Sequence, residues 1–147
     1  MMLLAKKNIK MQLTLKTILN FKEKHEDFIY RDVRLKNGRI EVTIDPRKRS
    51  LGKCSGCGER CPGYDRLPLR EFIHVPIWGV QVILLYCMRR VSCKACGIIS
   101  EQVPWSSGKS PITIGYGWFL SEWAKLLSVQ EVARQFKTSW RSEERRV

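Results

Sequence analysis

Two short cysteine motifs in the sequence have the spacing of metal ligands. Cys54 and Cys57 form one CxxC motif, Cys93 and Cys96 form a second, and a glycine follows each of them. Four thiolates complete the tetrahedral shell of a structural zinc ion, and glycine permits the positive φ that turns backbone amides toward the sulfurs. Four ordinary buried thiols are the alternative, which is less favoured because both motifs share the CxxCG pattern. We therefore predict one zinc ion bound by Cys54, Cys57, Cys93 and Cys96.

The other cysteines and the histidines lack such a pattern. Cys61 is an alternative ligand, but its spacing from Cys57 and the proline after it favour a loop thiol. Cys87 lies in a run of β-forming residues and is interpreted as a core residue, and the isolated His25 and His74 as structural or exposed residues. Four aspartates lie in separate turns and strands: Asp27, Asp32, Asp45 and Asp65. Because these acids do not converge, the sequence predicts no acid–base or two-metal catalysis.

The chain of 147 residues is strongly basic, with a net charge of +13 and a pI of about 9.8. Such a surface favours polyanions, because lysine and arginine neutralise phosphates and release their counterions. Many small proteins are basic without binding nucleic acid, so the charge alone leaves both interpretations open. Basic residues adjoin the cysteine motifs in the sequence and are the best candidates for phosphate contacts, against the alternative of a solvated basic face: Arg47, Lys48, Arg49, Arg89 and Arg90.

Strands must carry the two cysteine motifs, and the pattern of β-forming residues predicts them on both sides. The expected strands are 28–35, 39–44, 70–76, 80–91 and 98–103. Asn37-Gly38 is the favoured chemistry of a tight hairpin turn, and Trp78-Gly79 is expected to form a second turn. Residues 59–68 hold two prolines and a glycine and are predicted to be a loop. Each cysteine motif would then lie at a strand end, as in zinc ribbons.

Helical periodicity appears near the N-terminus and again after a linker. Residues 12–24 predict a short helix, and residues 106–111 form the linker. Beyond it, one helical face is apolar: Tyr116, Phe119, Leu120, Trp123, Ala124 and Leu127. Trp118 and Trp123 are interpreted as core residues of this helical segment.

A second and a third helix are predicted in the C-terminal part. Ser128 and Glu131 form a capping box that begins the second helix, whose buried side is expected to hold Val129, Val132, Ala133 and Phe136. Lys137-Thr138 would be the turn, and Ser139 would cap a third helix. Two helices joined by a short turn, with the small Ala133 facing the partner helix, have the layout of a helix-turn-helix. A purely structural helical hairpin is the alternative.

These residues together resemble the N-terminal region of bacterial insertion-sequence transposases of the group called ISL-three. The matching stretches are Cys54-Ser55-x-Cys57-Gly58, Gly63-Tyr64-Asp65, Arg70, Trp78-Gly79, Arg89-Arg90-Val91-x-Cys93-x-x-Cys96-Gly97, Glu101-x-Val103-Pro104-Trp105 and Trp123-Ala124-Lys125-x-Leu127-Ser128-x-x-Glu131-Val132-Ala133-x-x-Phe136. In that family a zinc-binding domain and a helix-turn-helix precede a larger catalytic domain with three metal-binding carboxylates. The resemblance implies a function in cutting and moving a DNA element.

The chain departs from the family pattern in its last residues. Glu143 and Glu144 occupy the face on which the third helix should dock, where the family has an apolar residue. We expect a truncated or frameshifted tail after Trp140, and a chain that lacks the catalytic domain and is not itself an enzyme. Further DNA contacts are expected from Lys137, Thr138, Ser139 and Arg141.

The sequence thus predicts an α+β protein, with a small β-rich zinc-ribbon-like domain followed by a helix-turn-helix segment. The expected divisions are a basic leader with a short helix (1–27), the hairpin and zinc domain (28–105), the linker (106–111) and the helical segment (112–147). The expected partners are double-stranded DNA at the terminal repeats of an insertion element, and a second copy or an intact transposase. Because no secretory segment is recognised, a cytoplasmic protein is expected. The alternative function is a zinc-ribbon adaptor that binds protein or RNA.

Overall fold

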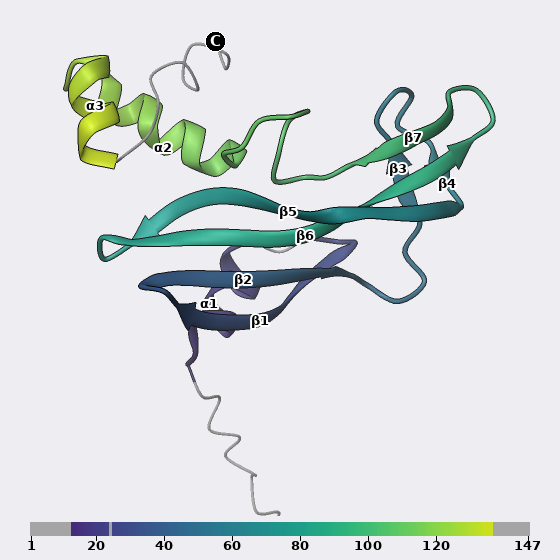
Figure 1. The fold of residues 1–147 in the computed structure, drawn as a ribbon, viewed down its shortest axis with the longest axis horizontal. Coiled ribbons are helices and arrows are strands. Elements are labelled where there is room, and N and C mark those ends of the chain that lie inside the picture. The colour runs from purple at the N-terminus through teal and green to yellow at the C-terminus, as the bar shows by residue number, and fades with distance from the viewer. Residues whose placement is uncertain (1–12, 24, 137–147) are drawn as a thin grey trace, which may run out of the picture.

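The computed structural model describes residues 13–23 and 25–136, and this part of the chain is mostly β-structure (Figure 1). Its seven strands form a sheet in the order β1-β2-β6-β7-β3-β4, with β5 paired to β6. The strands are β1 (Phe28–Lys36), β2 (Arg39–Pro46), β3 (Gly52–Cys54), β4 (Arg60–Cys61), β5 (Gly63–Ile77), β6 (Val80–Cys93) and β7 (Gly97–Gln102). The helices are α1 (Leu15–Lys22), α2 (Ile114–Ala124) and α3 (Val129–Phe136).

Two hairpins build the centre of the sheet, and both predicted turns are confirmed. Asn37 and Gly38 have φ of 53° and 72°, and Trp78 and Gly79 have φ of 49° and 76°. Positive φ at both central residues matches the twist of the flanking strands in a two-residue hairpin turn. The hairpins are joined by β2 and β6, which pair in parallel from Ile40 opposite Val82 onward.

The loop predicted over residues 59–68 is wrong. Arg60–Cys61 form β4, and β5 begins at Gly63 and continues through Pro68. Pairing with β6 overrides the local turn signal, and the pairing shifts register between Arg66 and Leu69, so the proline lies at an irregularity. Irregular or edge positions are where a strand accepts proline, because its nitrogen cannot donate to the ladder.

The main core lies on one face of this sheet, around Trp105. The Trp105 ring meets Phe28, Phe72 and Tyr86 edge-on, at centroid separations of 4.9, 5.9 and 5.2 Å. Edge-to-face contacts of this kind stabilise an aromatic cluster beyond the area it buries. The predicted N-terminal helix is confirmed as α1, which adds Leu19 to the same core.

The segment from residue 106 to the start of α2 packs against β5. The Arg70 Nη2 donates to the backbone oxygens of Gly108 and Ser110, at 3.1 and 3.0 Å. Residues 111–113 then run alongside Ile73, which donates its backbone N–H to the Pro111 oxygen and accepts from Thr113. Figure 1 shows the helical pair beyond this segment, at the end of the sheet where β5 turns into β6.

Two of the three helices expected in the C-terminal part are present as α2 and α3. The predicted capping box is confirmed, because Ser128 Oγ accepts from the Glu131 backbone N–H and Glu131 accepts from that of Ser128. Three predicted core positions are wrong, because Val129, Trp118 and Trp123 are 47%, 70% and 41% exposed. The helices bury one narrow stripe around Tyr116, Leu120 and Val132, and these three side chains lie outside it.

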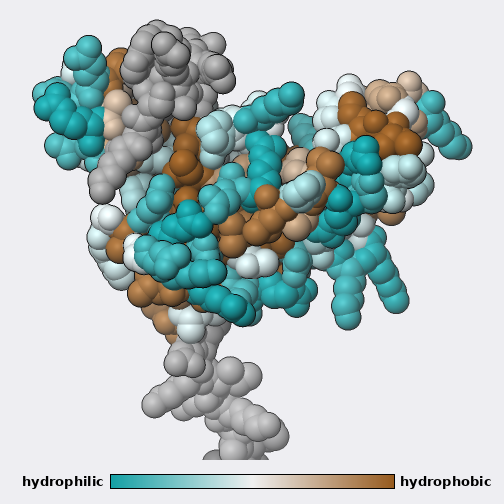
Figure 2. Space-filling model, in the orientation of Figure 1, coloured by the Kyte–Doolittle hydropathy of each residue, from teal (hydrophilic) through white to brown (hydrophobic). Residues whose placement is uncertain are grey.

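The third helix expected from Ser139 onward lies outside the described residues. Figure 2 shows hydrophilic side chains over much of the visible face of the sheet, with hydrophobic ones between them near its middle, at its helical end and at the opposite end, where β7 and β3 lie. None of the described helices is long and apolar enough to span a bilayer.

Candidate metal centre

Two strand pairings bring the cysteine motifs together. The first motif follows β3, and the second forms the turn between β6 and β7, in which Cys93 pairs with Gly97. β3 pairs with β7 so that Cys54 lies opposite Glu101. Gly58 and Gly97, the glycines after the two motifs, both have φ of 79°, which is the conformation predicted for them. The sheet therefore carries both cysteine turns to one end.

The four predicted ligands converge on one point. The Sγ atoms of Cys54, Cys57, Cys93 and Cys96 all lie within 4.8 Å of one another, and those of Cys57 and Cys93 are 3.6 Å apart. A tetrahedral ion with Zn–S bonds of about 2.3 Å requires sulfurs about 3.8 Å apart. Cys54 and Cys93 are buried while Cys57 and Cys96 are exposed, so the site lies at the surface of the ribbon. The cluster can hold a metal ion such as zinc.

Backbone amides lower the pKa of two of the four thiols, those of Cys54 and Cys93. The Gly56 N–H donates to Cys54 Sγ at 3.4 Å, and the backbone N–H groups of Cys57 and Gly56 lower the pKa of Cys54. The N–H groups of Cys96 and Ala95 likewise lower the pKa of Cys93 to about 6. A thiolate is the form that binds metal, so these turns favour ligation.

The pKa values of the other two thiols, Cys57 and Cys96, are raised. The neighbouring sulfurs of Cys54 and Cys57 raise the pKa of Cys96 to about 12. Four thiolates this close repel one another, and a divalent ion supplies the charge that stabilises all four. Gly56 shows how tightly the turns approach, since a Cβ there would lie 2.9 Å from Cys96 Sγ.

Cys61 stands beside the cluster without joining it. It is 5% exposed and packs with Val91 and the two buried cysteines. Burial, followed by the Cys93 sulfur, raises the pKa of Cys61 to about 11, and its Sγ contacts the Glu59 carbonyl oxygen at 3.4 Å. Cys61 is thus a buried residue of β4, and its interpretation as a loop thiol is wrong. Cys87 is only partly buried.

The basic residues beside the cysteine motifs differ in exposure. Arg47, Lys48 and Arg49 are all exposed, in the turn between β2 and β3. The side chain of Arg89 is 12% exposed and forms an ion pair with Glu101. Arg90 is 38% exposed and pairs with Asp65. The first three side chains are therefore the accessible cations, while Arg89 is largely enclosed.

A buried carboxylate organises this region, and the sequence reasoning assigned it no role. Glu101 is 2% exposed and accepts from the Arg89 backbone N–H at 2.8 Å, the Arg89 Nε at 3.0 Å and the Tyr86 hydroxyl. Only the family motif that begins at Glu101 marked this residue in the sequence. The other predicted DNA contacts, Lys137, Thr138, Ser139 and Arg141, lie outside the described residues.

One comparison with known proteins identifies the cysteine-bearing region. Residues 50–96 match the family model described as the zinc-finger of transposase IS204/IS1001/IS1096/IS1165, and this range contains all four ligands. Comparisons with curated proteins and with solved structures gave no match. The resemblance seen in the sequence is confirmed over this range, and a transposase zinc finger suggests a DNA-binding role in an insertion element.

Proposed function

We propose that this chain, in which residues 50–96 are a transposase zinc finger, binds double-stranded DNA at the ends of a mobile element. The observation that carries the proposal is the exposed basic turn formed by Arg47, Lys48 and Arg49, directly before the zinc-finger region. Three adjacent cations that are free to reach phosphate oxygens supply affinity for any duplex through counterion release.

The backbone contacts of this turn hold it in place beside the ribbon. The Arg47 N–H donates to the Asp27 oxygen at 2.7 Å, and the Ser50 N–H donates to the Arg47 oxygen at 3.1 Å. Arg89 Nη1 donates to the Ser50 oxygen at 2.9 Å. Among the described residues, none of the three basic side chains is in an ion pair. The backbone of the turn is therefore held by hydrogen bonds, and its three basic side chains are exposed to solvent.

Zinc has a structural role in this proposal. Bound by Cys54, Cys57, Cys93 and Cys96, it joins β3 to the β6–β7 turn and so fixes the ribbon that follows the basic turn. The ion would supply four metal–sulfur bonds and the positive charge that keeps the thiols ionised.

Base contacts would come from the C-terminal part of the chain. We infer that α2, α3 and the residues after them form a helix-turn-helix, in which Lys137, Thr138, Ser139 and Arg141 approach the DNA. Glu143 and Glu144 follow these residues in the sequence and are negatively charged, so we expect sequence reading to be weak and phosphate contacts to supply most of the affinity.

Fluorescence anisotropy with labelled duplexes tests the proposal. We expect binding to a terminal repeat of the element to weaken steeply as salt increases. The triple variant Arg47→Gln, Lys48→Gln, Arg49→Gln should lower the magnitude of the log–log salt slope by about 1 for each lost phosphate contact. The matched control removes three exposed lysines from α1 and the end of β1, Lys16→Gln, Lys22→Gln and Lys36→Gln, and should leave the slope nearly unchanged.

Two outcomes would contradict the proposal. Equal loss of binding in both triple variants would mean that net charge alone, without a defined surface, attracts the DNA. Absence of salt-dependent duplex binding would favour the alternative, a zinc-ribbon adaptor for protein or RNA.

A further inference from the structure

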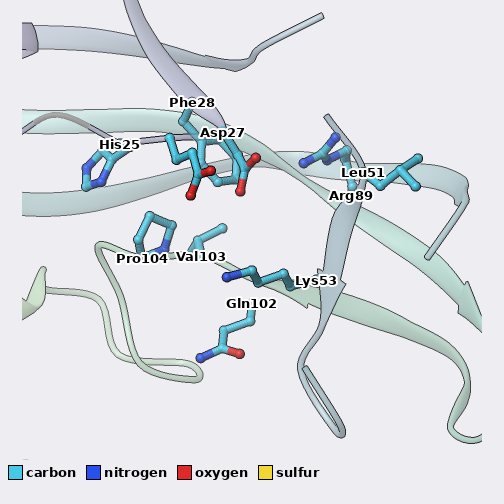
Figure 3. Close-up of a pocket in the computed structure, with 10 residues that line it drawn as sticks. His25, Asp27, Phe28, Leu51, Lys53, Arg89, Gln102, Val103 and Pro104 are labelled. Atoms are coloured by element: carbon cyan, nitrogen blue, oxygen red, sulfur yellow. The ribbon is translucent and has the colours of Figure 1, made fainter. Parts of the chain in front are cut away.

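A cavity of about 340 Å³ lies where the start of β1 meets β3 and the end of β7. Phe28, Arg89 and Val103 form its inner walls, and Lys53 and Gln102 come from the two ribbon strands (Figure 3). Cavities of this size are at the lower end of the range that holds small organic ligands. The cavity belongs neither to the metal cluster nor to the helical pair.

One wall of the cavity holds a buried donor that lacks an acceptor. Arg89 uses its Nε for Glu101 and its Nη1 for Ser50, at 3.0 and 2.9 Å. Its Nη2 is buried and has no hydrogen-bond partner in the described part of the chain. Buried polar groups in folded proteins are nearly always hydrogen-bonded. The Nη2 atom therefore marks a position where an N–H could donate to an acceptor atom of a ligand.

One inner wall of the cavity is apolar. The Phe28 ring is 4.9 Å from the Trp105 ring, which holds it edge-on, and the Arg89 Cζ lies 5.7 Å from the Phe28 centroid. Val103 and Pro104 contribute apolar surface beside it (Figure 3). Phe28 is 5% exposed and belongs to the core, so this wall offers a ligand apolar contact at its edge and no open ring face.

Polar groups of both kinds surround this apolar wall. Lys53 is exposed and extends from β3 into the cavity, below the Asp27 carboxylate (Figure 3). Asp27 is held by Arg60 at 2.8 Å, and Glu26 lies next to it on the same wall. A ligand here meets donors on one side and carboxylate acceptors on the other.

The mouth of the cavity adjoins the proposed phosphate-binding turn. Asp27 accepts a backbone hydrogen bond from Arg47 at 2.7 Å, so the cavity wall and the basic turn are joined. A nucleotide whose phosphate contacts the turn therefore has its base within reach of the cavity.

We propose that this cavity receives one unpaired base of the bound DNA, and that guanine fits it best. Guanine presents a carbonyl oxygen, O6, to Arg89 Nη2 and Lys53, and its N1–H and N2–H groups to the carboxylates of Asp27 and Glu26. Its ring would lie beside the apolar wall, near the exposed Pro104. Adenine carries an amino group, a donor, where guanine carries O6, so it would turn a donor toward the donors Arg89 Nη2 and Lys53. The inference rests on the proposed DNA binding and adds a base-accepting site to it.

The test compares one duplex with flush ends to the same duplex carrying a single unpaired guanine or adenine at one end. Anisotropy at fixed salt should show about tenfold tighter binding with the unpaired guanine and a smaller gain with adenine. Lys53→Gln and Leu51→Trp, the second of which fills the mouth of the cavity, should remove the gain. Lys94→Gln is the matched control, because it removes one exposed lysine charge from the other cysteine turn, and it should keep the gain.

Each outcome decides between the two proposals. If the flush duplex binds and the unpaired guanine does not increase the affinity, the proposed base site is wrong. The proposed function is not affected by that result. A gain that persists in both cavity variants, or is lost equally in Lys94→Gln, also overturns it. An equal gain with adenine overturns the assignment of guanine. If no duplex is bound at all, the proposed function fails and this inference fails with it.

Discussion

Arg89 and Glu101 form an ion pair 3.0 Å long between side chains that are 12% and 0% exposed. The pair joins β6 to β7, between the hydrophobic core and the cysteine-bearing end of the sheet. The same Arg89 guanidinium reaches Ser50 after the basic turn, and the same carboxylate accepts from Tyr86 in the core. One enclosed ion pair thus couples the hydrophobic core, the ribbon and the backbone of the basic turn.

Removing one partner of this pair should be strongly destabilising. Arg89→Met leaves Glu101 as an uncompensated buried charge, and breaking a buried pair in this way costs about 3–5 kcal/mol of unfolding free energy. Urea denaturation measures the loss. The control is Arg90→Met, which breaks a pair whose partner, Asp65, is 40% exposed, and it should change the midpoint little. Similar losses in the two variants would refute the structural role given to Arg89.

The metal centre should contain one zinc ion per chain. Elemental analysis of protein purified under reducing conditions should give that ratio, and Cys54→Ser should lower both the zinc content and the melting temperature, because ligation is coupled to folding. Cys87→Ser is the matched control, since Cys87 lies outside the sulfur cluster. Unchanged melting in the presence of a strong chelator would overturn the assignment.

The close approach of the two cysteine turns predicts a specific role for Gly56. Gly56→Ala should weaken zinc binding, because the added Cβ would come within 2.9 Å of Cys96 Sγ. Competition with a chromophoric chelator measures the affinity. Gly63→Ala is the control, since a Cβ at Gly63 meets nothing within 4 Å. Equal zinc affinity in both variants would show that the turns are not packed as described.

A part-buried polar contact between Glu23 and His74 predicts that acid weakens the fold. Burial alone would raise the pKa of Glu23, but the hydrogen bond and charge of His74 outweigh it and place the pKa below the ordinary 4.5. His74 Nε2 and Glu23 Oε1 are 2.5 Å apart. A depressed carboxyl pKa contributes stability that is fully present above pH 4.5 and is lost as the pH falls through the folded-state value.

Melting curves of wild type and Glu23→Gln between about pH 3 and 7 test this expectation. The wild type should melt higher at neutral pH, and the difference should shrink as the pH falls below the ordinary value of 4.5. Taking the difference between the two proteins cancels acid effects that they share, including loss of zinc. Glu26→Gln, at an exposed position, should follow the wild type. A difference that stays constant with pH would contradict the prediction.

The N-terminal leader should be dispensable for folding. Residues 1–10 match nothing in the family resemblance, and they lie outside the described residues. We expect deletion of Met1–Lys10 to leave the melting temperature unchanged, as measured by circular dichroism. A clear decrease would show that the leader packs on the folded chain.

Local chemistry explains which parts of the fold could be predicted. Asn37-Gly38 and the glycines after each cysteine motif require positive φ, and the structure has it at Asn37, Gly38, Gly58 and Gly97. The metal ligands followed from residue type and spacing alone. The Ser128 capping box likewise depends on residues three apart in sequence.

Nonlocal contacts explain what could not be predicted. The strand through Pro68 exists because β6 pairs with it, and no local pattern reports that partner. Arg89 and Glu101 form an ion pair with each other. In the sequence, each is a charged residue of the kind normally expected at the surface, and nothing there indicates their pairing. Trp118 is exposed because α2 and α3 bury only a narrow stripe of side chains. The periodicity of apolar residues in the sequence does not specify the width of that stripe.

The parallel pairing of β2 with β6 has a consequence for synthesis of the chain. β2 ends at Pro46, but its partner begins at Val80, beyond the first cysteine turn and all of β5. On the ribosome, the N-terminal hairpin therefore emerges well before the strand that pairs with β2. β6 ends at Cys93, and β7 follows it and joins β6 to β3. We expect closure of the sheet and capture of the metal to occur late and together, so that nascent chains stopped before residue 93 remain open to proteases.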